Sequence, residues 1–130
     1  PRRRKGTSML KKVAYVSVLV TDQERSLEFF TNVLGFEKRG DLQTPKGPRF
    51  VTVGVEGQDL ELVLWPGTPA RAEPGSAVYT IEVDDCRAVF ATLEGRGVVF
   101  EPAEVLEFPW GFAARFCDPD GNMFQLREGR

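Results

Sequence analysis

The sequence predicts an α+β fold in which two βαβββ modules form a mixed, curved sheet around a central cleft. The first observation behind this prediction is an internal repeat: a short apolar strand that ends in Asp, a helical pattern and further strands occur twice, over residues 15–61 and 78–125. Repetition at a fixed spacing indicates two copies of one supersecondary unit. We therefore expect the two copies to pack around a shared site.

The second observation is the composition, which is that of one soluble globular domain. The chain has 130 residues, 42% of them hydrophobic and 28% charged, with a net charge of −2. This charge balance argues against a nucleic-acid partner, and no apolar run approaches the length of about 20 residues that spans a bilayer. The isolated Cys86 and Cys117 are expected to be free thiols, which indicates a cytoplasmic protein.

We divide the chain into an N-terminal extension, residues 1–8, and a single domain, residues 9–130. The extension contains four consecutive basic residues ahead of Met9 and is expected to be disordered, with a functional basic arm as the alternative. Within the domain, modules at 9–65 and 76–128 are joined by a linker at 66–75 that is rich in Pro and Gly.

The elements of the first module follow from periodicity and from turn residues. Residues 13–20 alternate between an all-aliphatic face and a mixed face, which predicts a strand whose aliphatic face packs on a helix. Thr21 and Asp22 offer an N-cap for a helix at 23–33, and Gly35 is placed to end it. A loop at 40–48 and two strands, 49–55 and 58–65, complete the module.

The second module repeats this order. A strand at 78–83 leads to an Asp84-Asp85 N-cap and a helix that ends near Leu93. Further strands are expected at 98–100, 111–117 and 122–127, with some strand character within the loop at 101–109. The Asp118-Pro-Asp-Gly121 segment predicts a tight turn, because Pro presets φ and Gly tolerates positive φ.

Several motifs in this layout resemble the vicinal oxygen chelate superfamily, which includes glyoxalase I, bleomycin-resistance proteins, fosfomycin-resistance enzymes and extradiol dioxygenases. The residues that carry the likeness are Val20-Thr-Asp22, Ser26-Leu-Glu-Phe-Phe30, Val33-Leu-Gly-Phe36, Arg96-Gly97 and Phe116-Cys-Asp-Pro-Asp-Gly-Asn122. The resemblance covers essentially residues 10–126 and implies the two-module fold, with a small-molecule cleft between strands.

The resemblance also locates four positions at which metal-using members carry ligands, typically His or Gln, Glu, His and Glu. In this sequence they hold Tyr15, Glu61, Val78 and Gln125, and the chain contains no histidine. One carboxylate and one amide are a poor ligand set for Zn, Ni or Fe. We therefore expect no metal and no cofactor.

Strand alternation predicts which residues face the cleft. The expected ligand-binding residues are Tyr15, Ser17, Phe50, Thr52, Trp65, Val78, Thr80, Trp110, Arg115 and Gln125, with Glu61 as the candidate catalytic residue. Glu61 and Arg115 have two interpretations: a structural pair that neutralises itself, or a general base with an anion-orienting cation. Trp65 and Trp110 either cover the core or stack on a ligand.

Two functions remain open from the sequence. The first is a metal-independent small-molecule binding protein of the glyoxalase and bleomycin-resistance type, with antibiotic sequestration as one form. The alternative is a metal-free lyase or isomerase that uses Glu61 as general base, with Arg115 or Tyr15 stabilising an oxyanion. Whether the protein is an enzyme is left open. The resemblance further implies a homodimer, in which modules pair within one chain or between chains.

Overall fold

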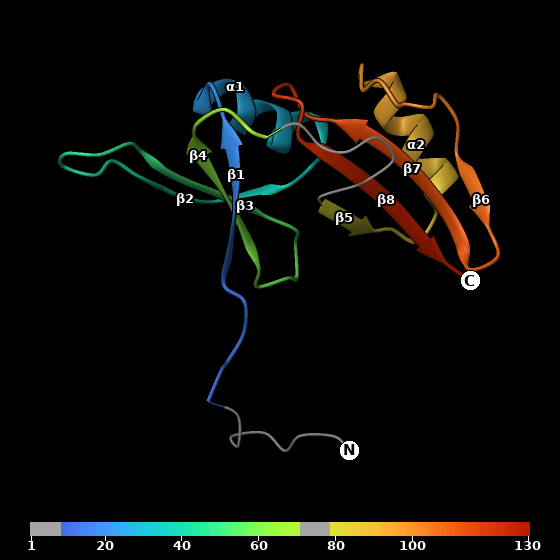
Figure 1. The fold of residues 1–130 in the computed structure, drawn as a ribbon, viewed down its shortest axis with the longest axis horizontal. Coiled ribbons are helices and arrows are strands. Elements are labelled where there is room, and N and C mark those ends of the chain that lie inside the picture. The colour runs from blue at the N-terminus through green and yellow to red at the C-terminus, as the bar shows by residue number, and fades with distance from the viewer. Residues whose placement is uncertain (1–8, 71–78) are drawn as a thin grey trace.

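The computed structural model describes residues 9–70 and 79–130. The elements of module 1 are β1 (Tyr15–Val20), α1 (Gln23–Glu28), the π-helix η1 (Phe29–Val33), β2 (Glu37–Leu42), β3 (Phe50–Gly54) and β4 (Glu61–Pro66). The elements of module 2 are β5 (Tyr79–Glu82), α2 (Cys86–Gly95), β6 (Leu106–Phe108), β7 (Gly111–Cys117) and β8 (Met123–Gly129). The predicted α+β fold of two βαβββ modules is confirmed (Figure 1). The predicted extension at 1–8 and part of the predicted linker lie outside the described residues.

Each module has its own four-stranded mixed sheet. The strand orders are β1-β4-β3-β2 and β5-β8-β7-β6. In both sheets the first and last strands of the module pair in parallel, and the remaining pairs are antiparallel. A parallel pair needs a crossover connection. In each module the helix, which follows the first strand in the chain, forms part of that connection. This order leaves β1 and β5 at sheet edges.

The helix starts are as the sequence predicts. Asp22 and Asp85 are the N-caps, and their carboxylates accept hydrogen bonds from the main-chain N–H groups of Arg25 and Ala88 at 3.1 and 3.0 Å. The first helix differs from expectation in its last turn, which is a π-helix. There the Thr31 hydroxyl donates to the Leu27 carbonyl at 2.8 Å, the oxygen that a regular helical bond from residue 31 would use.

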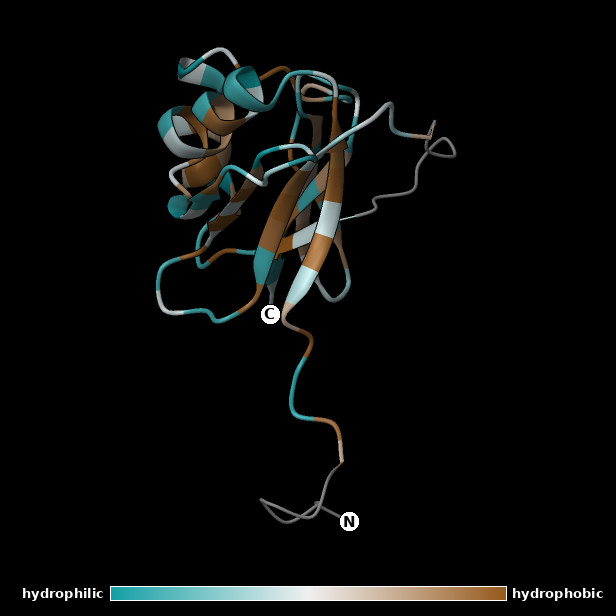
Figure 2. Ribbon diagram, turned by 90° about the vertical axis from the view of Figure 1, so that its left-hand side faces the viewer, coloured by the Kyte–Doolittle hydropathy of each residue, from teal (hydrophilic) through white to brown (hydrophobic). Residues whose placement is uncertain are grey.

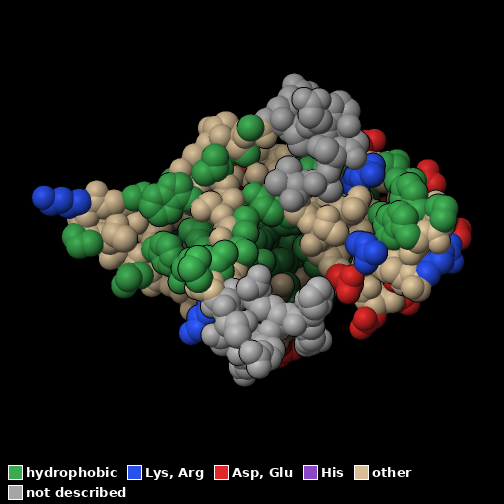
Figure 3. Space-filling view, turned by 60° about the horizontal axis from the view of Figure 1, so that its bottom comes forward, with side chains coloured by type: hydrophobic (Ala, Val, Ile, Leu, Met, Phe, Trp, Pro, Cys, Tyr) green, Lys and Arg blue, Asp and Glu red, His purple; other side chains and the backbone are tan. Residues whose placement is uncertain are grey.

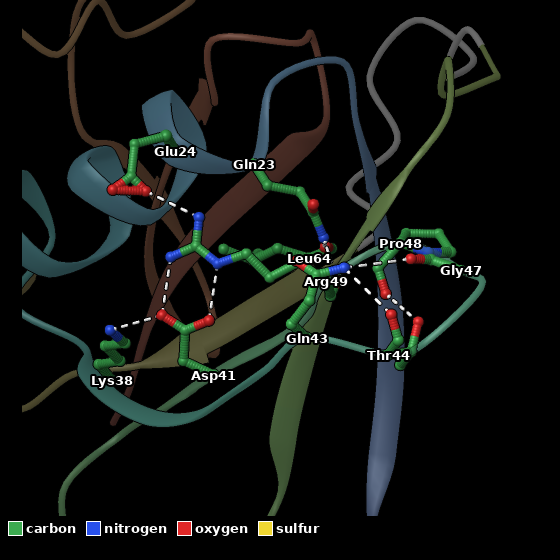
Figure 4. A network of polar contacts seen from close by, with 10 residues as sticks. All are labelled: Gln23, Glu24, Lys38, Asp41, Gln43, Thr44, Gly47, Pro48, Arg49 and Leu64. Carbon is green, nitrogen blue, oxygen red and sulfur yellow. Dashed lines mark hydrogen bonds and ion pairs between the residues drawn. The ribbon is translucent and has the colours of Figure 1, made fainter.

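The predicted loop at 40–48 is wrong in its first part, because β2 continues to Leu42. The strand is a polar edge strand with a register shift near Gly40, so it lacks the apolar alternation by which strands are recognised in sequence. Ion pairs also connect this strand to neighbouring elements. Asp41 pairs with Lys38 at 2.7 Å and with Arg49 at 2.6 Å, and Arg49 also reaches Glu24 on α1 (Figure 4). Hydrogen bonds from these two cations hold the pKa of Asp41 well below its usual range.

The predicted strand at 98–100 is also wrong. Only Phe100 makes a strand-like contact, an isolated bridge to Phe116, followed by a hydrogen bond from Glu101 N to Arg115 O at 2.9 Å. The second strand of module 2 is β6, which lies in the segment for which the sequence predicts only partial strand character. The apolar residues at 98–100 serve the core rather than a ladder, since Val98 and Phe100 are buried while Val99 is exposed.

Both modules contribute to one hydrophobic core. Val18 and Val20 of β1, Phe30 of η1 and Phe124 of β8 belong to the same buried cluster, and the Phe30 and Phe124 rings meet edge to face at 5.5 Å. Hydrophobic and hydrophilic residues alternate along the strands (Figure 2), and many of the hydrophobic ones belong to this cluster. The aliphatic face predicted for the first strand is therefore buried as expected at its C-terminal half. None of the described helices is long and apolar enough to cross a membrane.

Candidate functional site

The cleft-facing residues predicted for module 1 share one face of the first sheet. Tyr15 lies opposite Glu61 in the β1–β4 ladder, and its ring meets Phe50 edge to face at 5.7 Å. Thr52 is 1% exposed, and among the described residues its hydroxyl has no hydrogen-bond partner. Trp65 lies exposed near the end of β4. This face thus presents aromatic rings beside a single carboxylate.

The residues predicted for module 2 lie on the second sheet. Gln125 has two ladder neighbours, Thr80 on β5 and Arg115 on β7. The Arg115 Nε donates to the Gln125 side-chain oxygen at 3.1 Å. Trp110 stacks on Phe108 with ring centroids 5.2 Å apart, and the Arg127 guanidinium lies 5.0 Å from its ring centroid. Val78 falls outside the described residues.

Glu61 and Arg115 lie on different sheets and have different partners. The nearest cation to Glu61 is Arg39, at 3.9 Å between Nη1 and Oε2. Arg39 is itself held by Glu37 at 3.0 Å and by the Val55 carbonyl at 2.7 Å. Among the described residues no ion pair joins Glu61 to Arg115, so the structure does not support the interpretation that they neutralise each other within one chain.

A groove lies between the two modules. Its volume is about 710 Å³, and hydrophobic side chains gather in it when the molecule is viewed from below (Figure 3). We call it the inter-module groove. Its lining residues are Val16, Phe36, Gly54, Val55, Gln58, Leu60, Leu62, Tyr79, Thr80, Ile81, Glu82 and Phe124. A smaller hollow of about 250 Å³ continues it toward α2 and shares Phe36, Val55, Ile81 and Glu82.

Of the predicted ligand-binding residues that the structure describes, only Thr80 lines this groove. The other lining residues lie mostly on the opposite, aliphatic strand faces, which the sequence assigns to helix packing. The length of the helix relative to the strands could have predicted this uncovered surface. At about 1.5 Å per residue, α1 and η1 together are shorter than the strand face beside them at about 3.3 Å per residue. The N-terminal part of β1, at Val16, is therefore left uncovered and half-buried.

The turn that carries much of the family likeness joins the two modules. Asn122 donates through Nδ2 to the Leu19 carbonyl at 2.9 Å, and Asp120 accepts from the Thr21 main-chain N–H at 3.0 Å. The Asp120 side chain is 1% exposed and also pairs with Arg25 at 3.2 Å. Asp118 organises the turn by accepting from the N–H and the amide of Asn122, at 2.8 and 2.9 Å. Burial raises the pKa of Asp118.

A further contact closes the same side of the interface. The Tyr79 hydroxyl donates to the Ser17 carbonyl at 3.0 Å, and its ring stacks on Phe124 at 4.8 Å. Burial raises the pKa of Tyr79, so the hydroxyl stays a donor at neutral pH. The turn at 118–122 and Tyr79 together form what we call the closed seam, along the free edge of β1.

The donor set at the family's metal positions does not fit a divalent ion. A guanidinium lies beside the carboxylate and beside the amide at these positions, Arg39 near Glu61 and Arg115 on Gln125. Within the described ranges no three Asp, Glu, Cys or His side chains are grouped to hold a metal. Burial raises the pKa of both thiols, Cys86 and Cys117, which disfavours the thiolate that a metal needs.

Comparison with known proteins agrees with this geometry. The family model of the glyoxalase/bleomycin resistance protein/dioxygenase superfamily matches residues 12–126. The chain is 31% identical to the uncharacterized protein YetH of Bacillus subtilis (strain 168), over 92% of this chain and all of that one. It is also similar to the crystal structure of TnmS3, an antibiotic binding protein from Streptomyces sp. CB03234, with 32% identity and a TM-score of 0.81 over 95% of this chain and 99% of that one.

A solved superfamily member from Sphaerobacter thermophilus DSM 20745 is 36% identical, with a TM-score of 0.81 over 93% of this chain and 99% of that one. The family match and these structural likenesses extend over both modules. The chain therefore belongs to the glyoxalase/bleomycin resistance protein/dioxygenase superfamily.

Proposed function

We propose that this protein binds a small, largely apolar molecule in the inter-module groove, without a metal ion and without turnover. The observation that carries the proposal is the groove itself. Its volume of about 710 Å³ lies within the range of roughly 300–1,000 Å³ that small-molecule sites occupy. Its lining is mainly aliphatic and aromatic, with a few polar groups at Gln58, Thr80 and Glu82. Sequestration of an antibiotic is the biological role that this binding would serve.

The similarity to TnmS3 supports binding rather than catalysis, because that protein is described as an antibiotic binding protein. Metal independence is supported by Arg39 and Arg115, whose positive charges lie beside Glu61 and Gln125, the groups that would have to hold the ion. A second cation there would be repelled at these distances.

The alternative function, a lyase or isomerase with Glu61 as general base, has less support in the geometry. Glu61 does not line the groove, and Arg115, the proposed oxyanion partner, belongs to the other sheet. A general base must lie within hydrogen-bond reach of the proton that it removes. A Glu61→Gln variant that loses a measured turnover would revive this alternative.

We also propose a homodimer. The predicted cleft-facing residues of the two modules lie on separate sheets, with Tyr15 and Glu61 on one and Arg115 and Gln125 on the other. In a dimer, the first sheet of one chain could face the second sheet of its partner and bring such faces together. Light scattering should give twice the chain mass, and a monomeric mass would contradict the dimer without affecting the groove.

The binding proposal is tested with N-phenyl-1-naphthylamine, a neutral probe that fluoresces in apolar sites. We expect saturable fluorescence and a raised melting temperature. Val55 lines both hollows and is 38% exposed, so Val55→Trp should fill the groove without disturbing the core. The matched control is Val99→Trp, at an exposed position (76%) that does not line either hollow.

Loss of probe binding in Val55→Trp but not in Val99→Trp is the expected result. Equal binding by both variants, or no binding by the unmodified protein, would overturn the proposal. A parallel calorimetric titration with Ni²⁺, Zn²⁺, Mn²⁺ and Mg²⁺ should give no stoichiometric binding at micromolar ion. A stoichiometric ion would overturn metal independence alone.

A further inference from the structure

The free edges of β1 and β5 present main-chain groups in the same way. Glu61 N donates to Ala14 O and Gly67 N donates to Val20 O. The main-chain N–H and C=O groups of the even-numbered residues of β1 therefore point toward β4. The main-chain groups of Ser17 and Leu19 therefore face outward, and they are the ones that the closed seam satisfies. An edge strand exposes such a row of N–H and C=O groups unless another element covers it.

On β5 the same alternation directs the main-chain N–H and C=O groups of Thr80 and Glu82 outward, away from the sheet edge. Val83 N donates to Arg127 O at 2.9 Å, so the odd-numbered residues face β8. Among the described residues, no hydrogen bond or ion pair joins the β3–β4 turn at 55–60 to β5, although that turn lies across the groove from it. We call this side of the interface the open seam. It offers outward carbonyl groups on one wall of the groove.

The described lining of the groove carries few charged groups. Among the described lining residues Glu82 is the one acidic side chain and no basic side chain is present, and Glu82 pairs with Arg127 at 2.9 Å. Gln58 and Thr80 supply neutral polar groups, and no hydrogen bond within the described residues uses the Gln58 side-chain amide. A charged ligand would lose its hydration here without gaining an unpaired counter-charge.

We propose that the groove binds a neutral aromatic molecule that donates a hydrogen bond, from a phenol or an amide N–H, to the outward carbonyl groups of Thr80 and Glu82. This proposal rests on the proposed binding function and specifies its ligand class. The closed seam shows the chemistry that such an edge accepts: there a phenol, Tyr79, and an amide, Asn122, donate to outward carbonyls. The ligand takes the corresponding role on β5, while its ring contacts the apolar wall of Val16, Leu60 and Leu62.

The experiment compares four naphthalenes as competitors of N-phenyl-1-naphthylamine. They are 2-naphthol, which donates; 2-methoxynaphthalene, which cannot donate; 2-naphthoate, an anion; and 2-(aminomethyl)naphthalene, a cation. We expect 2-naphthol to bind roughly tenfold more tightly than the methyl ether, the size of one net hydrogen bond, and more tightly than either ion. In carbonyl-detected NMR, 2-naphthol should shift the ¹³C′ resonances of Thr80 and Glu82.

The possible failures are distinguishable. If the naphthol and its ether bind equally, leave these carbonyl resonances unmoved and are both blocked by Val55→Trp, the hydrogen-bond inference is overturned and the binding function stands. If either ion binds more tightly than 2-naphthol, the inferred neutrality is overturned. If none of the four competes, or if Val55→Trp leaves their binding unchanged, the groove is not the site and the proposed function fails with the inference.

Discussion

The closed seam and the open seam are built from corresponding parts of the two modules but end differently. In each, a turn between the last two strands of one module lies beside the first strand of the other. Both turns contain a glycine in the left-handed region, Gly121 at φ 88° and Gly57 at φ 84°. The first turn reaches β1 through Asn122 and Asp120. The second turn leaves a groove beside β5.

The difference teaches where a repeated fold can acquire a ligand site. Side-chain donors and an aromatic stack fill the closed seam, so its strand edge is satisfied by the protein. The open seam has aliphatic residues and Gln58 at its turn, and none of the hydrogen bonds among the described residues joins that turn to β5. Two corresponding interfaces of the repeated fold therefore differ in a few side chains, and the proposed binding site is the one without the cross-module hydrogen bonds.

The largest expected effect comes from a change in the core that the two modules share. Phe30 is fully buried and meets Phe36 and Phe124 edge to face at 5.4 and 5.5 Å. Phe30→Ala should lower the free energy of unfolding by about 3–5 kcal/mol, because it removes a ring and leaves a cavity. Urea denaturation measures this, with the exposed Val99→Ala as control, expected within about 0.5 kcal/mol of the unmodified protein. A loss below 1 kcal/mol for Phe30→Ala would show that the modules do not share this core.

The next change separates the seams directly. Asn122→Ala leaves the Leu19 carbonyl and one Asp118 carboxylate oxygen without their donor, which should cost about 1–3 kcal/mol of unfolding free energy. Gln58→Ala, on the turn of the open seam, should change it by less than about 0.5 kcal/mol. Chemical denaturation of both variants tests the contrast. Equal losses of unfolding free energy would show that the two seams contribute equally to stability.

A smaller effect is expected for the phenol of the closed seam. Tyr79→Phe keeps the ring stacked on Phe124 and removes only the hydrogen bond to the Ser17 carbonyl. The free energy of unfolding should fall by about 1 kcal/mol. Hydrogen exchange within β1 offers a second readout, since its protection should decrease in this variant. An unchanged unfolding curve would indicate that water replaces the hydroxyl without cost.

The smallest effect is a pH dependence of the closed seam. Burial raises the pKa of Asp118 above its ordinary value of 3.8. A raised pKa means that the folded state binds the proton more tightly than the unfolded state does. The stabilisation from the protonated Asp118 is therefore fully present below the unfolded pKa and is lost as pH rises through the folded one. The difference in unfolding free energy between the unmodified protein and Asp118→Asn should therefore decrease as pH rises from 3.5. A difference that stays constant with pH would contradict the assignment.

Much of the fold was predictable because its signals are local. Asp22 and Asp85 as N-caps, Gly35 after the first helix and the alternation in β1 each depend on near neighbours in sequence. β2 was missed because its polar sequence lacks the apolar alternation of a half-buried strand, while its ladder with β3 and its ion pair with Arg49 depend on partners outside the strand. The segment at 98–100 was misjudged because burial in a core and pairing in a sheet select the same apolar residues.

The site was less predictable than the fold. Alternation correctly separates the two faces of β1, but the sequence does not show how much of a face its helix covers, and Val16 lies where the cover ends. The groove also depends on which turn approaches which strand edge. That is decided by contacts across about a hundred positions, such as Leu19 with Asn122, and a repeat pattern treats the two edges as equal.

The core shared by the modules has a consequence for each module on its own. Val18 and Val20 of one repeat are buried in the same cluster as Phe116 and Phe124 of the other. Either module expressed alone would expose that apolar surface to water, so we expect an isolated half to associate with an identical copy. The covalent link between the halves removes that requirement for symmetry, and the two halves of this chain carry different residues at corresponding positions.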